Sequence, residues 1–424
     1  MPETHDSIII GAGPAGSTAA ALLAEKGRDV LLIEKETFPR YHVGESLMPF
    51  CWYTLQRLGL EKKMDEIGFV QKHSVQFVTP DGRQSRPFYF FQHKEHPSST
   101  TWQVERSEFD NMIYRTAKEN GAKTLEGTKV KDVIKDDNGT VVGVIAIHPD
   151  GTEKEHFGKM TVDATGRDAL ISRKQKWRKR DPKLDKIALW TYYEGAMRDP
   201  GLDEGTTTVA YIPERGWFWY IPLRDNRVSI GIVANRDYLY RDGLKDPEAI
   251  MDREILENVW IQEHLAPGKK EGNYRTTGEF SYRSEFCAGD GFLLAGDAFA
   301  FLDPVFSSGV FLAMKTGELA ADAIDAALDT GDFSASQFHA YGAETCAAIE
   351  RMRALVYAFY DENFSFGKLI KANPDLRPEL TDCLIGDLFE DKFGPLFKAV
   401  AEIADLPGHL EYGMKTHSKA IAMA

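Results

Sequence analysis

The first residues with the spacing of a binding site are Gly11, Gly13 and Gly16, which form a G-x-G-x-x-G pattern. An apolar run at residues 7–10 precedes them, and residues 14–26 have the composition of a helix. Between a strand and a helix, the first glycine permits a tight turn and the second lets the backbone approach a diphosphate. The third lets the helix pack closely on the strand. The pattern predicts a dinucleotide on the helix N-terminus, where free N–H groups favour an anion.

Glu34 supports the same prediction, because it ends a second apolar run at residues 29–34. A carboxylate at this place accepts hydrogen bonds from ribose hydroxyls. Strand, helix and strand together form a βαβ opening. The chain of 424 residues has no second G-x-G-x-x-G, so we expect no separate nicotinamide domain. Reducing equivalents would then come from transient NAD(P)H binding or from a separate reductase, and both remain open.

Three later segments carry chemistry of their own. Residues 162–167 (VDATGR) follow an apolar strand, and so does the pair Gly296-Asp297. Residues 301–309 (FLDPVFSSG) fit the pattern F-x-x-P-x-x-S-x-G. A Ser-Ser-Gly turn that opens a helix offers backbone N–H groups to a small anion such as chloride or bromide.

Residues 217–222 (WFWYIP) fit the pattern W-x-W-x-I-P. Alternating aromatic side chains on an extended segment point to one face and make a rigid wall between two compartments. The alternative is an ordinary core strand, because aromatic residues favour strands and proline favours strand ends.

These motifs together resemble the flavin-dependent halogenases, within the larger FAD-dependent superfamily that includes aromatic hydroxylases and geranylgeranyl-type reductases. The resemblance covers residues 7–329 and implies FAD as the cofactor. It implies a halide ion on Ser308 and Gly309, and a wall or tunnel built from Trp217, Trp219 and Pro222. The implied cofactor contacts are Gly11, Gly13, Ala15, Gly16, Glu34, Arg40, Glu45, Ser46, Arg106, Val130, Asp163, Gly166, Asp297, Pro304, Gly309 and Val310.

Lys72 is the residue that the resemblance marks as catalytic. It lies downstream of residues 44–47 (GESL), and in the halogenases a lysine at this place carries the halogen as a haloamine or hydrogen-bonds hypohalous acid. Desolvation lowers the pKa of an ammonium group, and a partly neutral amine can accept electrophilic halogen or orient it. The alternative is a surface lysine, which we expect for Lys62 and Lys63.

The implied activity is halogenation of an electron-rich aromatic or similar substrate, free or carrier-bound, with reduced flavin, O2 and chloride or bromide. Two alternatives remain: an FAD-dependent monooxygenase or reductase of the same fold, and a non-catalytic flavin-binding redox protein. The basic run at residues 173–180 (RKQKWRKR) either docks an acidic carrier protein or is a solvated helix or loop face.

The expected fold is α/β, with an FAD-binding Rossmann-like βαβ core, an inserted antiparallel substrate sheet and a helical C-terminal region. Residues 1–185 would form the first part of the FAD-binding domain, with substrate-site segments at about 62–105. Residues 186–280 would form the substrate sheet, 281–330 the closing part of the FAD-binding domain, and 331–424 the helical region.

Charge and cysteine usage limit the class of protein further. The net charge of −14 argues against a nucleic-acid partner. Glycines and a proline interrupt the most apolar window, residues 8–24, so we expect no membrane span. Four widely spaced cysteines have no metal-ligand spacing, which favours a reduced, cytoplasmic protein without a bound metal.

Overall fold

The chain begins with the expected βαβ unit. The computed structural model describes residues 3–181, 183–278 and 281–418; the parts of the predicted segments at 1–2, 182, 279–280 and 419–424 lie outside the described residues. β1 (Thr4–Ile10) runs parallel to β2 (Val30–Ile33), and α1 (Pro14–Glu25) connects them. Both strands bury nearly every side chain, as a central strand covered on both faces requires.

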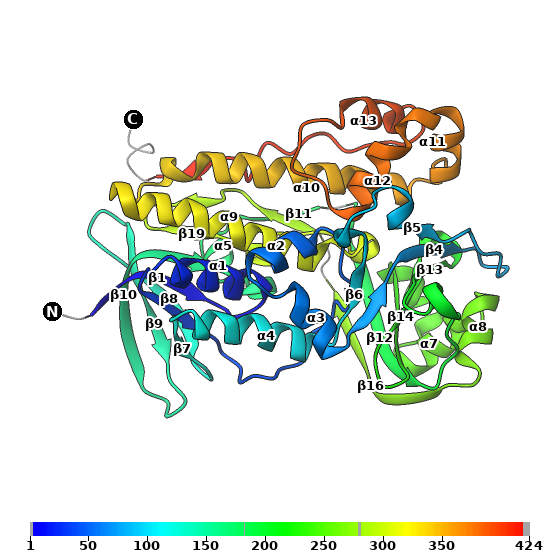
Figure 1. The fold of residues 1–424 in the computed structure, drawn as a ribbon, viewed down its shortest axis with the longest axis horizontal. Coiled ribbons are helices and arrows are strands. Elements are labelled where there is room, and N and C mark those ends of the chain that lie inside the picture. The colour runs from blue at the N-terminus through cyan, green and yellow to red at the C-terminus, as the bar shows by residue number, and fades with distance from the viewer. Residues whose placement is uncertain (1–2, 182, 279–280, 419–424) are drawn as a thin grey trace.

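The main sheet has the order β21-β18-β19-β10-β1-β2-β7. Its central strands are parallel: β10 (Glu153–Asp163), β19 (Phe292–Leu294) and β7 (Lys123–Leu125) join β1 and β2. The predicted hairpin is present as β8 (Lys129–Lys135) and β9 (Val141–Ile147), paired antiparallel. α1 packs against α4 (Arg106–Glu119) and α9 (Ser308–Thr330) (Figure 1).

A second sheet forms the other half of the molecule, and its order is β16-β12-β15-β14-β13-β4-β5 (Figure 1). Its long strands are β12 (Lys186–Glu194), β14 (Trp217–Pro222), β15 (Arg227–Asn235) and β16 (Lys269–Gly278), all antiparallel to their neighbours. β13 (Thr207–Tyr211) pairs with β14 and, in parallel, with β4 (Ser74–Val78), which β5 (Phe88–Tyr89) flanks. The inserted antiparallel sheet is therefore confirmed.

The alternation of side chains along β14 divides this sheet into two faces. Phe218 and Tyr220 pack in a core with residues of α7 (Pro247–Ile255) and α8 (Val259–Leu265). Trp217 and Trp219 belong to the core shared with the main sheet. The tryptophans of the W-x-W pattern thus face the dinucleotide-binding half.

Two small sheets join the halves. β3 (Val70–Lys72) pairs antiparallel with β6 (Thr101–Gln103), next to α2 (Cys51–Arg57) and α3 (Glu61–Ile67). β11 (Arg178–Arg180) pairs with β17 (Tyr282–Ser284), which also pairs with β20 (Ala300–Phe301). The basic run spans a helix end, a turn and a strand, and its exposed basic side chains agree with a solvated face: Arg173, Lys174, Lys176, Lys179 and Arg180. Its first part ends α5 (Leu170–Lys174), Trp177 is buried, and its last residues form β11, where the Arg178 guanidinium lies 3.9 Å from the Tyr282 ring centroid.

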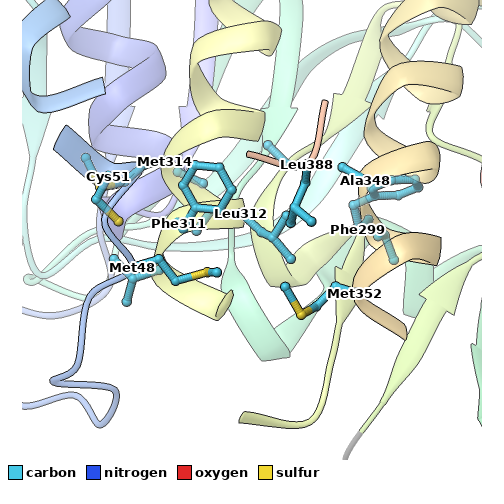
Figure 2. Packing of buried hydrophobic residues seen from close by; sticks show 14 of the residues in the cluster. Met48, Cys51, Phe299, Phe311, Leu312, Met314, Ala348, Met352 and Leu388 are labelled. Atoms are coloured by element: carbon cyan, nitrogen blue, oxygen red, sulfur yellow. The ribbon is translucent and has the colours of Figure 1, made fainter. Parts of the chain in front are cut away.

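The C-terminal region is mainly helical, as expected. α10 (His339–Tyr360) lies alongside α9, and α11 (Phe366–Ala372), α12 (Arg377–Ile385) and α13 (Gly394–Ala401) form a cap at one end (Figure 1). Apolar side chains of α9, α10 and residue 388 pack in one buried cluster (Figure 2). The helical expectation fails at β21 (Thr416–His417), which extends the main sheet by pairing with β18 (Ala288–Gly289), because the edge of that sheet offers unpaired backbone groups. Among the described helices, none combines the length and apolar composition that crossing a bilayer requires.

Gly231 on β15 makes the position of the Trp219 indole possible. The two residues are cross-strand partners, and a β-carbon at position 231 would lie 2.1 Å from Trp219 Cζ2. We predict that Gly231→Ala displaces the indole and lowers the free energy of unfolding by about 1–3 kcal/mol. Urea unfolding followed by circular dichroism measures this effect. Gly394→Ala is the control, because a β-carbon there meets no heavy atom within 4 Å; equal losses in the two variants would contradict the prediction.

Candidate active site

A cavity of about 1030 Å³ lies where the two sheets meet. The β1–α1 turn, the end of β2 and the segment 40–46 line one part of it, and β12, β13, β14 and the segment 295–310 line the other. Among the residues predicted from the sequence, the wall contains Gly11, Gly13, Ala15, Glu34, Arg40, Glu45, Ser46, Arg106, Val130, Gly166, Trp217, Trp219, Asp297, Pro304, Gly309 and Val310. The cavity therefore brings most of the predicted site together from distant parts of the chain.

The three glycines of the fingerprint have different surroundings. Gly11 has φ +96°, and a β-carbon there would lie 2.5 Å from the Ala164 carbonyl oxygen. A β-carbon at Gly16 would lie 1.9 Å from the Gly11 carbonyl oxygen. Gly13 lines the cavity instead, and the heavy atom nearest to a β-carbon there would be Arg40 Nη2, at 3.5 Å. Gly11 and Gly16 thus close the turn, whereas Gly13 leaves room for a ligand in front of α1.

The N-terminus of α1 fits a diphosphate. Its N-cap residue is Gly13, which makes no side-chain capping bond, and Pro14 occupies the first turn. The first-turn N–H groups without such a cap are suited to hydrogen-bonding an anion in the cavity. The Glu34 carboxylate stands beside this turn, where its two oxygens accept hydrogen bonds from the amides of Ala12 (2.8 Å) and Glu36 (3.0 Å).

Two arginines fix the segment that covers the cavity. Arg106 Nε donates to Asp110 Oδ1 (2.7 Å), and Arg106 Nη1 donates to the Val43 carbonyl (2.8 Å). Arg40 Nη1 donates to the other oxygen of Asp110 (3.0 Å). Asp110 is fully buried, and the positive charge of Arg106 helps to lower the pKa of its carboxyl group against the effect of burial. Both predicted arginines therefore border the cavity and share one acid.

The two predicted aspartates differ in where their side chains lie. Asp163 lies off the cavity wall, and its carboxylate accepts hydrogen bonds from Thr165 (backbone N 3.1 Å, Oγ1 2.6 Å) and the Ile171 amide (2.7 Å). It organises the turn that carries Gly166. Asp297 lines the cavity, and burial raises the pKa of its carboxyl group to about 6.

The F-x-x-P-x-x-S-x-G segment forms a short helical turn, Pro304–Phe306, followed by α9. Ser307, the N-cap of α9, has φ 58° and makes no side-chain capping bond. Ser307 and Gly309 line the cavity, and Ser308 is buried behind them. The N-terminus of a long helix is therefore presented to the cavity, which is an arrangement suited to a small anion.

The aromatic wall is present on the cavity face of the second sheet. Trp217, Trp219 and Trp190 line the cavity, and the ring centroids of Trp190 and Trp219 are 6.3 Å apart. Pro222 ends β14, opposite Val228, and lies off the cavity wall. The wall is thus wider than the W-x-W pattern predicts. β15 pairs with β14 on one side and with β12 on the other, and β12 contributes Trp190.

Lys72 is not a surface lysine. Its side chain is 2% exposed, and Nζ donates to Ser46 Oγ (2.9 Å) and to the Leu47 carbonyl (3.1 Å). Burial lowers the pKa of the amine to about 7. Lys72 lies off the wall of the cavity, whereas Ser46 is part of it. The amine therefore sits one side chain away from the cavity.

A polar network behind Ser46 escaped the sequence analysis. Ser46 Oγ lies 2.8 Å from Thr207 Oγ1, and Gln103 Nε2 donates to the same threonine oxygen (2.8 Å). Glu45 has a comparable partner: the Tyr192 hydroxyl donates to its Oε1 (2.7 Å), and burial raises the pKa of this carboxyl group. Alternation predicted strands at Thr207 and Tyr192, but no local pattern showed which residues they would meet.

A dinucleotide turn, a helix N-terminus suited to an anion and an aromatic wall around one cavity are the features expected of an FAD-dependent oxidoreductase. A family model described as tryptophan halogenase matches residues 6–100 and 92–366. A 1H-pyrrole-2-carbonyl-[peptidyl-carrier protein] brominase of Pseudoalteromonas luteoviolacea is 37% identical, over 92% of this chain and 93% of the relative. The flavin-dependent halogenase armH3 of Armillaria mellea is 32% identical, over 91% of this chain and 82% of the relative.

Among solved structures, the flavin-dependent brominase Bmp2 superposes with a TM-score of 0.86 at 34% identity. The match covers 94% of this chain and 98% of Bmp2. The chain belongs to the flavin-dependent halogenase family. It is an FAD-dependent enzyme of that family, and its activity is halogenation rather than flavin binding alone.

Gly13 gives a direct test of the dinucleotide turn. We expect Gly13→Val to fold but to lose most of its FAD, because the new side chain enters the space in front of α1. Absorbance of the purified protein near the flavin band, against protein concentration, measures occupancy. Gly394→Val is the matched control outside the cavity. Full flavin content in Gly13→Val would show that the diphosphate binds elsewhere.

Lys72 and Ser46 give a pH test. With a pKa near 7, the neutral amine becomes the major form as pH rises through that value, so we expect halogenation to increase over this range. Ser46→Ala removes an acceptor for the ammonium form, and the acidic limb of the profile should move to lower pH. Product formation across pH 5.5–9, with reduced flavin in excess, provides the measurement. If the acidic limb lies at the same pH in Ser46→Ala and in the wild type, the limb does not report the titration of Lys72.

Proposed function

We propose that this protein halogenates an electron-rich aromatic acyl group that a carrier protein delivers as a thioester, with chloride or bromide as the halogen source. Two findings support the carrier-bound form. The brominase of P. luteoviolacea, whose name specifies a carrier-bound pyrrole, matches this chain over nearly its whole length. The match with the fungal relative armH3, whose name specifies no carrier, covers 82% of that relative, against 93% of the brominase.

The observation that carries the halogenation chemistry is the buried amine of Lys72 behind the cavity. The cofactor residues fit FAD: the α1 N-terminus would hold the diphosphate, Glu34 a ribose, and Asp297 the ribityl chain. Bound reduced FAD, with O2, supplies the oxidising equivalents that convert a halide ion into hypohalous acid. The backbone N–H groups at Ser308 and Gly309 would hold the halide close to that reaction.

The remaining residues keep the substrate and the flavin apart. The indoles of Trp217 and Trp219 occupy the face through which an aromatic substrate would approach the cavity. The oxidised halogen must then pass Ser46 to reach Lys72. In its neutral form the Lys72 amine has two possible roles. It attacks the halogen of hypohalous acid, so that an N–halogen bond replaces the O–halogen bond and water leaves, or it hydrogen-bonds hypohalous acid. In either case it directs the halogen to the substrate ring.

We also propose that a separate flavin reductase supplies the reduced cofactor. The chain carries one G-x-G-x-x-G pattern, and this turn lines the cavity described above. The basic run is poorly placed to receive a carrier protein at the aromatic wall. Arg173 and Lys174 line the part of the cavity beside Val130, on the dinucleotide side. The carrier would therefore bind elsewhere.

The test is a reconstituted assay with FAD, a separate flavin reductase, NADH, O2 and either bromide or chloride. We expect pyrrole-2-carbonyl-loaded carrier protein to acquire halogen, visible as an isotope pattern in the mass spectrum of the intact carrier. Omission of the reductase should reduce the rate at least tenfold. Lys72→Ala should bind FAD and consume O2 with reduced flavin but yield no halogenated product.

Lys72→Arg should also fail, because a guanidinium stays protonated and cannot act as a neutral amine. Lys62→Ala is the control, since Lys62 is an exposed lysine on α3. Halogenation at the wild-type rate in Lys72→Ala would overturn the assigned role of Lys72. Halogenation of free phenols, indoles or pyrrole-2-carboxylate, with no product on the loaded carrier, would overturn the carrier-bound substrate.

A further inference from the structure

The two tryptophans of the W-x-W pattern differ in what their indole N–H groups bind. Trp219 Nε1 donates to Ser229 Oγ (3.0 Å), on the adjacent strand β15. Trp217 Nε1 donates to the Tyr360 hydroxyl (2.9 Å), at the C-terminal end of α10. The first bond stays within the second sheet. The second connects the sheet to the C-terminal region, 143 residues away in the sequence.

Tyr360 passes this connection to the segment before α9. Its hydroxyl donates to Asp303 Oδ2 (2.8 Å), while Asp303 Oδ1 accepts the Val305 amide (3.1 Å). An indole N–H only donates and an ionised carboxylate only accepts, so with Asp303 ionised the Tyr360 hydroxyl accepts from Trp217 and donates to Asp303. All three groups are aligned in one donor-to-acceptor chain.

Asp303 determines the conformation of the segment that precedes α9. It is fully buried, its backbone N–H donates to Ser281 Oγ (3.1 Å), and its carboxylate caps the turn Pro304–Phe306. That turn ends at Ser307, which has a left-handed backbone and lines the cavity together with Gly309. A shift of the Asp303 carboxylate would therefore move the amides at 308 and 309.

We propose that Trp217 is a positioning residue for the halide ion, acting through Tyr360 and Asp303 on the amides at the start of α9. This inference rests on the proposed halide site at Ser308 and Gly309. It gives Trp217 a role that is distinct from its part in the wall, and it gives the C-terminal helix α10 a role in the reaction: α10 supplies the hydroxyl that joins the wall to the halide segment.

The neighbours of Tyr360 are consistent with a fixed geometry. Lys186 Nζ lies 4.1 Å from the centroid of the Tyr360 ring and donates to Asn235 Oδ1 (2.7 Å). The ring of Phe359 packs edge-on against both Tyr360 and Trp217, with centroid distances of 5.2 Å and 6.4 Å. The ring of Tyr360 is thus held by packing, and this fixes the position of its hydroxyl between Trp217 and Asp303.

The test compares the FAD-loaded enzyme with Trp217→Phe and Tyr360→Phe variants. Phenylalanine keeps an aromatic ring in the wall but removes the indole N–H, and Tyr360→Phe removes the hydroxyl that both neighbours need. We expect the bromide KM to rise about three- to tenfold in each variant, the range for loss of one buried hydrogen bond. Tyr360 does not line the cavity, so in Tyr360→Phe we expect kcat at saturating bromide and the KM for the organic substrate to change less than about twofold.

The double variant distinguishes coupling from local damage. Without the Tyr360 hydroxyl, Trp217 has lost its acceptor, so Trp217→Phe should add little to the bromide KM in the Tyr360→Phe background. Trp260→Phe is the matched control: Trp260 is a buried tryptophan on α8, on the far face of the second sheet, and its bromide KM should equal that of wild type. Trp219→Phe should raise the bromide KM less than Trp217→Phe.

A third variant separates this inference from the halide site on which it rests. A β-carbon at Gly309 would meet no heavy atom within 4 Å, so Gly309→Ala places a methyl group beside the amides without a protein clash. FAD occupancy is measured in every variant. A raised bromide KM in Gly309→Ala with unchanged values in Trp217→Phe and Tyr360→Phe overturns the inference and keeps the halide site. Unchanged bromide KM in all three overturns both, and additive effects in the double variant overturn the coupling.

Discussion

A buried amine without an acidic partner is the constraint on which the rest of this structure depends. The Lys72 side chain is almost fully buried, and its neighbours are a serine hydroxyl, a backbone carbonyl and the face of the Phe90 ring rather than an acid. A nearby carboxylate would stabilise the ammonium form and hold the pKa high. The neutral partners accept hydrogen bonds from Lys72 without adding a negative charge, so burial lowers the pKa of the amine to about 7. The amine is thereby partly neutral near pH 7, as the proposed role of Lys72 requires.

The fold meets this constraint by using two sheets for two tasks. The parallel sheet brings the carboxyl ends of β1, β2 and β10 to the turns that surround the dinucleotide site, as the crevice rule for such sheets predicts. The antiparallel sheet turns one face toward that site and fills it with indole rings. Lys72 belongs to neither. It lies on the short ladder of β3 and β6, where Ser46 also pairs with Gln103, so the amine and its route to the cavity share one support.

Local patterns predicted the parts of the site that are built locally. Gly11, Gly13 and Gly16 act within one turn, and their roles can be inferred because backbone geometry requires them. Trp217 and Trp219 share a face because strand residues alternate. The fold class followed from the order of such segments, and the comparisons with known halogenases confirm it. A strand at 416–417 escaped prediction because two residues have no periodicity and gain their partner only from the sheet edge.

Contacts between distant segments are what the sequence could not show. Ser46 and Thr207 are 161 residues apart, and neither lies in a pattern that indicates the other. Ser307 reaches the cavity while Ser308 is buried, because a left-handed residue at 307 rotates the start of α9. Asp163 follows a strand in the expected place, yet three hydrogen-bond donors of its own turn hold its carboxylate away from the cavity. A motif fixes where a residue stands in the chain, and packing decides where its side chain points.

The buried amine also lowers the stability of the folded protein, and the sign of this effect follows from the direction of the pKa shift. An unfolded chain holds the Lys72 proton up to its ordinary pKa, whereas the folded chain releases it near pH 7. Below pH 7 both states bind the proton and the folded state bears the full cost of a buried charge. As pH rises above 7 the folded state loses the charge first, so this contribution to the free energy of unfolding becomes less unfavourable. The hydrogen bond from Lys72 Nζ to Ser46 Oγ partly offsets this cost, and the contacts of Ser46 and Gln103 with Thr207 fix the same serine, so the network that supports the fold also positions the amine.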